Sequence, residues 1–159
     1  MLTVVMPSFH SSKLVEERIL EIEKNIPIII IENSRNVEFK KKIENKHKNV
    51  KIIIPEENLG YGKAYNVGIK NSKTEMVFLT QPDLLLVENC INKLVELTKE
   101  FKDFSVLTPY DKNDQVWTNY EIYNDKKKII KKNKLTLKEV DYVDLSWLIN
   151  KTNFSDEDF

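Results

Sequence analysis

Short apolar runs alternate with longer amphipathic segments over the first two thirds of this chain. The apolar runs are rich in β-branched residues and predict strands at 2–6, 28–31, 50–54, 76–80 and 104–107. The segments between them repeat apolar residues at helical spacing, which predicts helices at 12–25, 37–46, 64–71 and 88–101. This alternation predicts an α/β, Rossmann-like fold: a mostly parallel sheet with helices on both faces.

Two local features add detail to this prediction. Four consecutive isoleucines at 28–31 predict a strand that is buried on both faces. Ser12 precedes Glu16 and Glu17, and it is the predicted N-cap of the first helix.

The pattern changes after Pro109. Segments 115–123 and 127–132 are predicted to form a hairpin across Asn124–Asp125, and a final half-buried strand follows. Apolar residues alternate along that last strand at Val143, Leu145, Trp147 and Ile149. We therefore predict one domain, 1–159, in which a βαβ part at 1–109 is followed by an antiparallel extension at 110–159.

Composition narrows the classes of partner. The chain has 159 residues, 41% of them hydrophobic, and a formal net charge of zero, so no overall field attracts it to nucleic acid. Its single cysteine, Cys90, excludes an internal disulfide framework and suits a reducing cytoplasm. No apolar run is long enough to span a membrane. We expect a cytoplasmic protein, and peripheral association with the inner face of the membrane stays open.

All three glycines fall in one stretch, 60–68, between a predicted strand and a predicted helix. Such a loop can present backbone N–H groups to a phosphate-bearing ligand. A tight strand-to-helix turn with one close packing contact at Gly68 explains the same pattern. From the residues alone, both interpretations stay open.

Each predicted parallel strand ends in polar residues, where a doubly wound sheet binds its ligands. These ends are Pro7–His10, Glu32–Ser34, Asn58–Gly60 and Gln81–Asp83. The Glu32 carboxylate could accept a hydrogen bond from a ribose hydroxyl or a base, or it could be a solvated strand terminus. Phe9 could stack on a base or belong to the core. Asp83 could bind Mg²⁺ or Mn²⁺ together with substrate phosphates, or it could belong to an ordinary turn.

The combination of these segments resembles the family 2 glycosyltransferases of the GT-A fold, and most closely the rhamnosyltransferase-like branch. The resemblance is carried by Asn58-x-Gly60-Tyr61-Gly62-x-Ala64-x-Asn66-x-Gly68 and by the strand that ends at Gln81-Pro82-Asp83. Val4-Val5-Met6-Pro7-Ser8-Phe9 and Ile31-Glu32-Asn33-Ser34 are also similar to segments of that family.

This resemblance implies a site for a nucleotide-diphosphate sugar, with Asp83 as the ligand of Mg²⁺ or Mn²⁺ on the diphosphate. The residues implied in donor binding are Pro7, Ser8, Phe9, Glu32, Asn33, Asn58, Gly60, Tyr61, Lys63 and Asn66. It further implies an inverting, metal-assisted transfer to a hydroxyl of a glycan or lipid-linked acceptor, as in the synthesis of cell-surface polysaccharides.

The chain also departs from the family pattern. Gln81 replaces an Asn or Asp, and the acidic segment 155–159 resembles the start of the segment that precedes the family's catalytic base. We therefore expect a chain cut before that base, with its catalytic residues unassigned. A catalytically silent nucleotide-sugar-binding module is one alternative. A nucleotidyltransferase is another, although it would need a glycine-rich, arginine-bearing loop that 7–13 does not provide.

Overall fold

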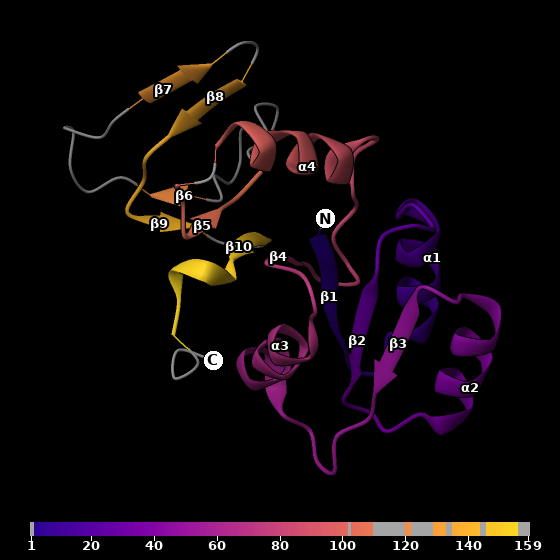
Figure 1. Ribbon diagram of the computed structural model, residues 1–159. Helices are drawn as coiled ribbons and strands as arrows, with labels where there is room; N and C mark the ends of the chain where they lie inside the picture. The colour runs from indigo at the N-terminus through magenta and orange to yellow at the C-terminus, as the bar shows by residue number, and fades with distance from the viewer. Residues whose placement is uncertain are drawn as a thin grey trace.

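A six-stranded sheet in the order β3-β2-β1-β4-β10-β5 is the centre of the molecule (Figure 1). The computed structural model describes residues 2–101, 103–109, 120–121, 129–132, 135–143 and 146–155. The strands of this sheet are β1 (Leu2–Ser8), β2 (Ile28–Glu32), β3 (Val50–Ile53), β4 (Met76–Leu79), β5 (Val106–Leu107) and β10 (Trp147–Asn150). The helices are α1 (Ser12–Glu21), α2 (Val37–Lys46), α3 (Gly60–Asn71), α4 (Cys90–Glu100) and the short 3₁₀ helix η1 (Lys151–Asn153).

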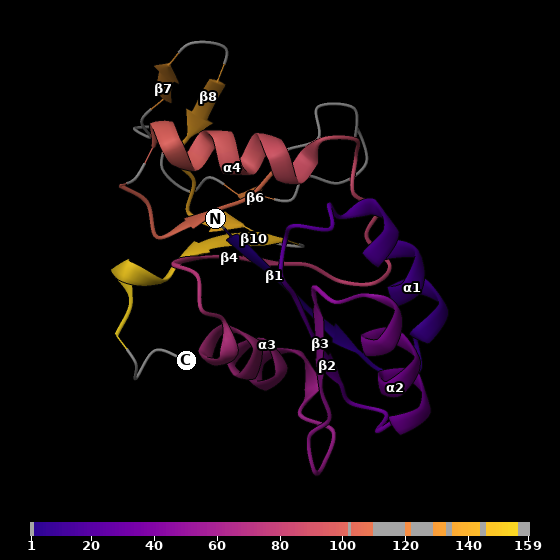
Figure 2. The same ribbon diagram turned by 45° about the vertical axis from the view of Figure 1, so that its right-hand side comes forward.

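The predicted α/β fold is confirmed. Strands β3, β2, β1 and β4 are parallel, and β10 runs antiparallel to both β4 and β5. Helices α1, α2 and α4 contribute to the core on one face of the sheet, and α3 covers the other face (Figure 2).

The run of isoleucines in β2 is buried on both faces, as predicted. Ile28 and Ile30 pack with α1 and α2, whereas Ile29 and Ile31 pack with α3. Full burial of such a side chain contributes about 1.5–3 kcal/mol. A strand with this composition is therefore stable only in the interior of the sheet.

The order of the strands creates a switch point between β1 and β4. From β1 the chain proceeds outward to β2 and β3, and α3 then carries it across the opposite face to β4, on the other side of β1. The connections after β1 and β4 therefore diverge, which leaves space at the carboxyl ends of these two strands.

Two helix starts differ from the predictions. Helix α3 begins at Gly60 rather than at residue 64, so two of the glycines belong to its first turn. The N-cap of α1 is Ser11 rather than Ser12, and its side chain makes no capping hydrogen bond. The Ser11 Oγ lies 3.1 Å from the Oγ of Ser8 instead, because β1 extends to Ser8.

The predicted pairing after Pro109 is wrong in the described residues. Strand β7 (Ile129–Lys132) pairs with β8 (Leu135–Lys138), and β6 (Tyr120–Glu121) pairs with β9 (Tyr142–Val143). The predicted turn at Asn124–Asp125 lies outside the described residues. The sequence has a second polar break between residues 132 and 135, and the strands on either side of it pair with each other.

The predicted final strand is also divided in the structure. Val143 ends β9, whereas β10 begins at Trp147, and Leu145 lies outside the described residues. Strand β10 is inserted between β4 and β5, so both of its faces are covered rather than one: Leu148 faces the core of α1, α2 and α4, and Ile149 faces that of α3. Within the described ranges, no helix is long and apolar enough to cross a membrane.

Candidate functional site

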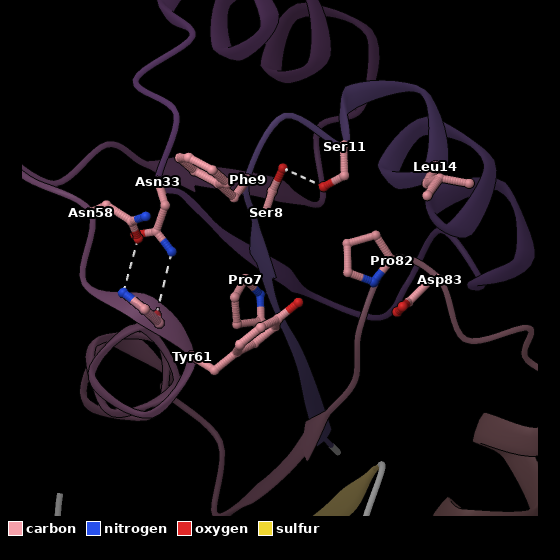
Figure 3. Close-up of a pocket in the computed structure, with 11 residues that line it drawn as sticks. Pro7, Ser8, Phe9, Ser11, Leu14, Asn33, Asn58, Tyr61, Pro82 and Asp83 are labelled. Carbon is pink, nitrogen blue, oxygen red and sulfur yellow. Dashed lines mark hydrogen bonds between the residues drawn. The ribbon is translucent and has the colours of Figure 1, made fainter.

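A pocket of about 260 Å³ lies at the switch point between β1 and β4. Figure 3 shows Asn33 and Asn58 on one side of it, Pro82 and Asp83 on the other, and Tyr61 between them. The residues that line it are Pro7, Ser8, Phe9, Ser11, Leu14, Asn33, Asn58, Gly60, Tyr61, Pro82 and Asp83. The polar ends of strands that are distant in the sequence thus meet in one cavity, as expected for a doubly wound sheet.

The structure brings most of the predicted site residues together, with three exceptions. Glu32, Lys63 and Asn66 do not line the pocket. Conversely, Ser11, Leu14 and Pro82 line it although they were not among the predicted site residues. Ser11 and Leu14 could have been found from their position, because the first turn of a helix that directly follows a central strand lies beside that strand's end.

Glu32 is fully buried behind the pocket and connects the ends of β1 and β2. The Ser8 hydroxyl donates to Glu32 Oε2 over 2.7 Å, and Ser8 and Glu32 are register partners in the sheet. The backbone N–H of Ser34 donates to Oε1 over 3.0 Å, and the Ser34 hydroxyl donates to the same oxygen. Hydrogen bonds to a carboxylate are stronger than those between neutral groups, so this network fixes Ser8, a residue that does line the pocket.

The side-chain amide of Asn33 holds the start of α3 against the end of β2. Its Oδ1 accepts from the N–H of Leu59 over 3.2 Å, and its Nδ2 donates to the carbonyl of Gly60 over 3.4 Å. The N–H of Gly60 in turn donates to Oδ1 of Asn58 over 2.9 Å. Gly60 has a φ of +66°, a conformation that glycine adopts without steric cost. This conformation explains why the turn into α3 carries a glycine at position 60.

Two residues without this freedom also adopt positive φ near the site. His10 has a φ of 52° just after β1, and Arg35 has a φ of 61° just after β2. Each such conformation costs about 1–3 kcal/mol. Both turn the chain sharply at a strand end, and the ring of His10 contacts that of Phe9 edge-on at 4.3 Å between centroids.

Three apolar side chains form exposed walls of the pocket. The exposed fractions are 55% for Phe9, 40% for Leu14 and 58% for Tyr61. Large apolar groups that are left exposed around a concave polar site are typical of a binding site. Two of the three are aromatic, so this pocket can accommodate a planar ring.

Asp83 is the acidic group of the pocket. It is exposed, and in the part of the chain that the structure describes its carboxylate has no hydrogen-bonding partner. The described residues also contain no group of three or more His, Cys, Asp or Glu side chains that could hold a metal ion. A cation at Asp83 would therefore need most of its ligands from a bound molecule.

Tyr65 of α3 contacts the segment that leads from β4 to Asp83. The Tyr65 hydroxyl donates to the carbonyl of Thr80 over 3.2 Å, and its ring packs edge-on against Trp147 of β10. Burial raises the pKa of Tyr65 far above its usual value, so the hydroxyl remains a donor at any ordinary pH. Residues of α3 and β10 thus fix the backbone from which the Gln81–Asp83 segment departs.

A comparison with models of protein families determines what kind of protein carries this pocket. The model of glycosyl transferase family 2 matches residues 3–156. The chain belongs to this family. A comparison with curated protein sequences found no significant match.

Two solved structures show how this family 2 chain relates to known folds. TarS 1-349 of S. aureus, in complex with UDP, has a TM-score of 0.57 at 21% identity, and the match covers 75% of this chain and 38% of TarS 1-349. The mannosyltransferase PcManGT of Pyrobaculum calidifontis, in complex with GDP-Man and Mn²⁺, has a TM-score of 0.56 at 16% identity over 66% of this chain and 34% of its own. The family 2 chain therefore spans between a third and two fifths of the length of these two proteins.

The fold is not restricted to glycosyltransferases. A CMP:2-keto-3-deoxy-manno-octonic acid synthetase complexed with CTP has a TM-score of 0.50 at 10% identity, over 66% of this chain and 50% of its own. At such low identity these likenesses show the fold alone. The family match, rather than the fold, therefore separates this chain from the nucleotidyltransferases.

Proposed function

We propose that this family 2 chain binds a nucleotide-diphosphate sugar in the pocket at the switch point of β1 and β4, and transfers the sugar to an acceptor hydroxyl. One observation carries the proposal: polar strand ends, two exposed aromatic rings and an exposed carboxylate converge on the same cavity. Membership of glycosyl transferase family 2 supports it, as do the nucleotide and nucleotide sugar bound to the two enzymes of similar fold.

The pocket divides this task among its residues. Phe9 and Tyr61 present aromatic surfaces to the planar base. Ser8, which Glu32 orients, and Asn58 offer hydrogen-bonding groups to the nucleoside. The diphosphate is placed towards Asp83 and the start of α3. The N–H of Gly60 there is taken by Asn58, but the next backbone N–H groups of a first helical turn have no intrahelical partner and favour an anion.

Asp83 suits a divalent cation that the donor brings with it. An exposed carboxylate without a partner is available for coordination, and Mg²⁺ or Mn²⁺ needs only one or two protein carboxylates when phosphate oxygens supply further ligands. Such an ion neutralises charge on the diphosphate leaving group.

The reaction proposed for this site is a single displacement with inversion. The acceptor oxygen forms a bond to the anomeric carbon while the bond to the diphosphate oxygen breaks, and the nucleoside diphosphate leaves with the electron pair. A carboxylate base takes the acceptor proton. The acidic residues 156–158, which the sequence resemblance places near that role, lie outside the described residues.

One observation favours a second candidate function. Asp83 is the sole carboxylate among the described residues that line the pocket, and it is assigned to the cation. A module that binds the donor without transferring sugar fits the described residues equally well. The acceptor, the rhamnosyltransferase-like specificity and a role in polysaccharide synthesis remain predictions from the resemblance.

Calorimetry with UDP, GDP and dTDP tests the binding step. We expect at least one of them to bind more tightly with Mn²⁺ than with EDTA. Asp83→Asn should lower the affinity in Mn²⁺ about tenfold, which equals about 1.4 kcal/mol, and leave the affinity in EDTA unchanged. Asp103→Asn is the matched control, because Asp103 is also exposed and does not line the pocket.

Equal affinity with and without Mn²⁺ in the unmodified chain would contradict the metal role of Asp83. Absence of binding for all three nucleotides would contradict the proposed function as a whole. Release of nucleoside diphosphate from a donor sugar in the presence of acceptor then separates the enzyme from the silent module.

A further inference from the structure

Arg18 of α1 is buried next to the segment that follows Asp83. The side chain of Arg18 is 6% exposed, and its Nη1 donates to the carbonyl of Leu84 over 3.4 Å and to Oε2 of Glu21 over 3.0 Å. Oε2 of Glu21 also accepts from the backbone N–H of Leu86 over 3.3 Å. One ion pair on α1 therefore holds a carbonyl and an N–H of the segment 84–86, which begins directly after Asp83.

The segment 84–86 is also hydrogen-bonded to the residues that precede Asp83. The N–H of Leu84 donates to the carbonyl of Gln81 over 3.3 Å, which closes a turn around Pro82 and Asp83. The turn is thus held from β4 on one side and from α1 on the other. Among the described residues, the carboxylate of Asp83 has no hydrogen-bonding or ion-pair partner, so its position depends on the backbone around it.

Stability alone explains this arrangement poorly. Burial of a guanidinium is costly, and the Nε of Arg18 has no hydrogen-bonding partner among the described residues. The chain has 23 lysines and only two arginines, so an arginine at this point is unusual for it. Unlike a lysine, an arginine offers several donors in a rigid plane and can hold two acceptors in a fixed relation.

We propose that Arg18 and Glu21 are positioning residues for Asp83, and that they set the affinity of the donor site for the diphosphate-bound cation. This inference rests on the proposed function. It follows from the count of ligands: a cation held by a single protein carboxylate has no second protein ligand to compensate when that carboxylate shifts. Residues that orient a metal ligand typically change metal affinity by about 10–100-fold when they are replaced.

The test measures nucleotide affinity by calorimetry in Mn²⁺ and in EDTA for Arg18→Met and Glu21→Leu. We expect the additional affinity in Mn²⁺ to fall about 10–100-fold while the affinity in EDTA stays the same. Glu21→Gln keeps an oxygen that can accept a hydrogen bond from the N–H of Leu86, so it should lose less of the additional affinity in Mn²⁺. Glu16→Gln is the control, because Glu16 also lies on α1 but pairs with Lys42 of α2, away from the pocket.

Amide hydrogen exchange at Leu86 provides a readout that does not depend on the nucleotide. The N–H of Leu86 should exchange faster in Glu21→Leu than in the unmodified chain, with global unfolding in urea still cooperative. Unchanged exchange at Leu86 would show that Glu21 does not hold this N–H, and would overturn the inference. Faster exchange with an unchanged effect of Mn²⁺ would overturn its positioning role. An unmodified chain that binds no nucleotide would overturn the proposed function and this inference with it.

Discussion

At the scale of the single residue, the three glycines of the chain are under different constraints. Gly60 is needed for its backbone conformation, since φ is +66° and a Cβ would meet nothing within 4 Å. Gly68 is needed for space, since a Cβ there would lie 2.2 Å from Cγ1 of Val5. Gly62 has neither constraint in the part of the chain that the structure describes, so contact with a ligand is the remaining role to test there.

Alanine substitutions at Gly60 and Gly62 separate conformation from ligand contact. Gly60→Ala should lower the free energy of unfolding by about 1–2 kcal/mol, because an L-residue is strained at positive φ. Gly62→Ala should raise it by up to about 1 kcal/mol, because alanine is the better helix former. Urea denaturation measures both. If Gly62→Ala stabilises the chain and also weakens nucleotide binding, the ligand approaches this turn; equal stability of the two variants would contradict the assigned conformations.

Gly68 and Val5 form a pair that can be tested by a double-mutant cycle. Gly68→Ala should cost about 1–3 kcal/mol, because the new methyl group overlaps the Val5 side chain in a fully buried contact. Val5→Ala removes the overlapping atoms, so the double variant should be less destabilised than the sum of the single variants. Simple additivity would show that Gly68 is not a packing contact.

The sequence located most of the pocket but not the direction of every side chain. The family resemblance implies Lys63 and Asn66 in donor binding, but neither lines the pocket. Both belong to α3, which begins at Gly60, so helical periodicity separates them from the residues of its first turn that do line it. Glu32 lies at the predicted strand end, yet it is the register partner of Ser8, which takes up its carboxylate. Such partners come from sheet register, which local sequence does not contain.

Strand β10 shows the same limit at the scale of the element. The parallel strands could be predicted because each is a short apolar run, and the alternation of strands and helices predicts that they run parallel. Alternation after Pro109 predicted strands but not their partners, since antiparallel pairing depends on which of several turns forms. Nothing in the composition of Trp147–Asn150 indicates insertion between β4 and β5.

The central position of β10 predicts a large cost for truncating its side chains. Leu148 is fully buried, so Leu148→Ala should lower the free energy of unfolding by about 2–5 kcal/mol. Leu20→Ala, on the exposed side of α1, is the matched control and should change it by less than about 0.5 kcal/mol. Similar small effects of both substitutions would indicate a peripheral strand.

At the scale of the whole molecule, the pocket and the sheet are one structure. The pocket is formed by the ends of β1 and β4, which are the two central strands of the six-stranded sheet, and β10 pairs directly with β4. Unfolding of the sheet therefore destroys the pocket. In contrast, the cavity that Leu148→Ala creates in the core should leave the residues that line the pocket in place. Ligand binding should then stabilise the sheet as a unit, by an amount that depends only on the affinity of the pocket.

This coupling predicts equal ligand-linked stabilisation in chains of unequal stability. At a concentration of 100 times Kd, a nucleotide that binds only the folded chain adds about 2.7 kcal/mol to the free energy of unfolding. Urea denaturation with Mn²⁺ and the tightest-binding nucleotide should show this increment both in the unmodified chain and in Leu148→Ala. Asp83→Asn, at the same nucleotide concentration, should gain about 1.4 kcal/mol less for each tenfold loss of affinity. A much smaller increment in Leu148→Ala than in the unmodified chain would show that the cavity reaches the pocket, and that β10 is part of the binding site rather than only of its support.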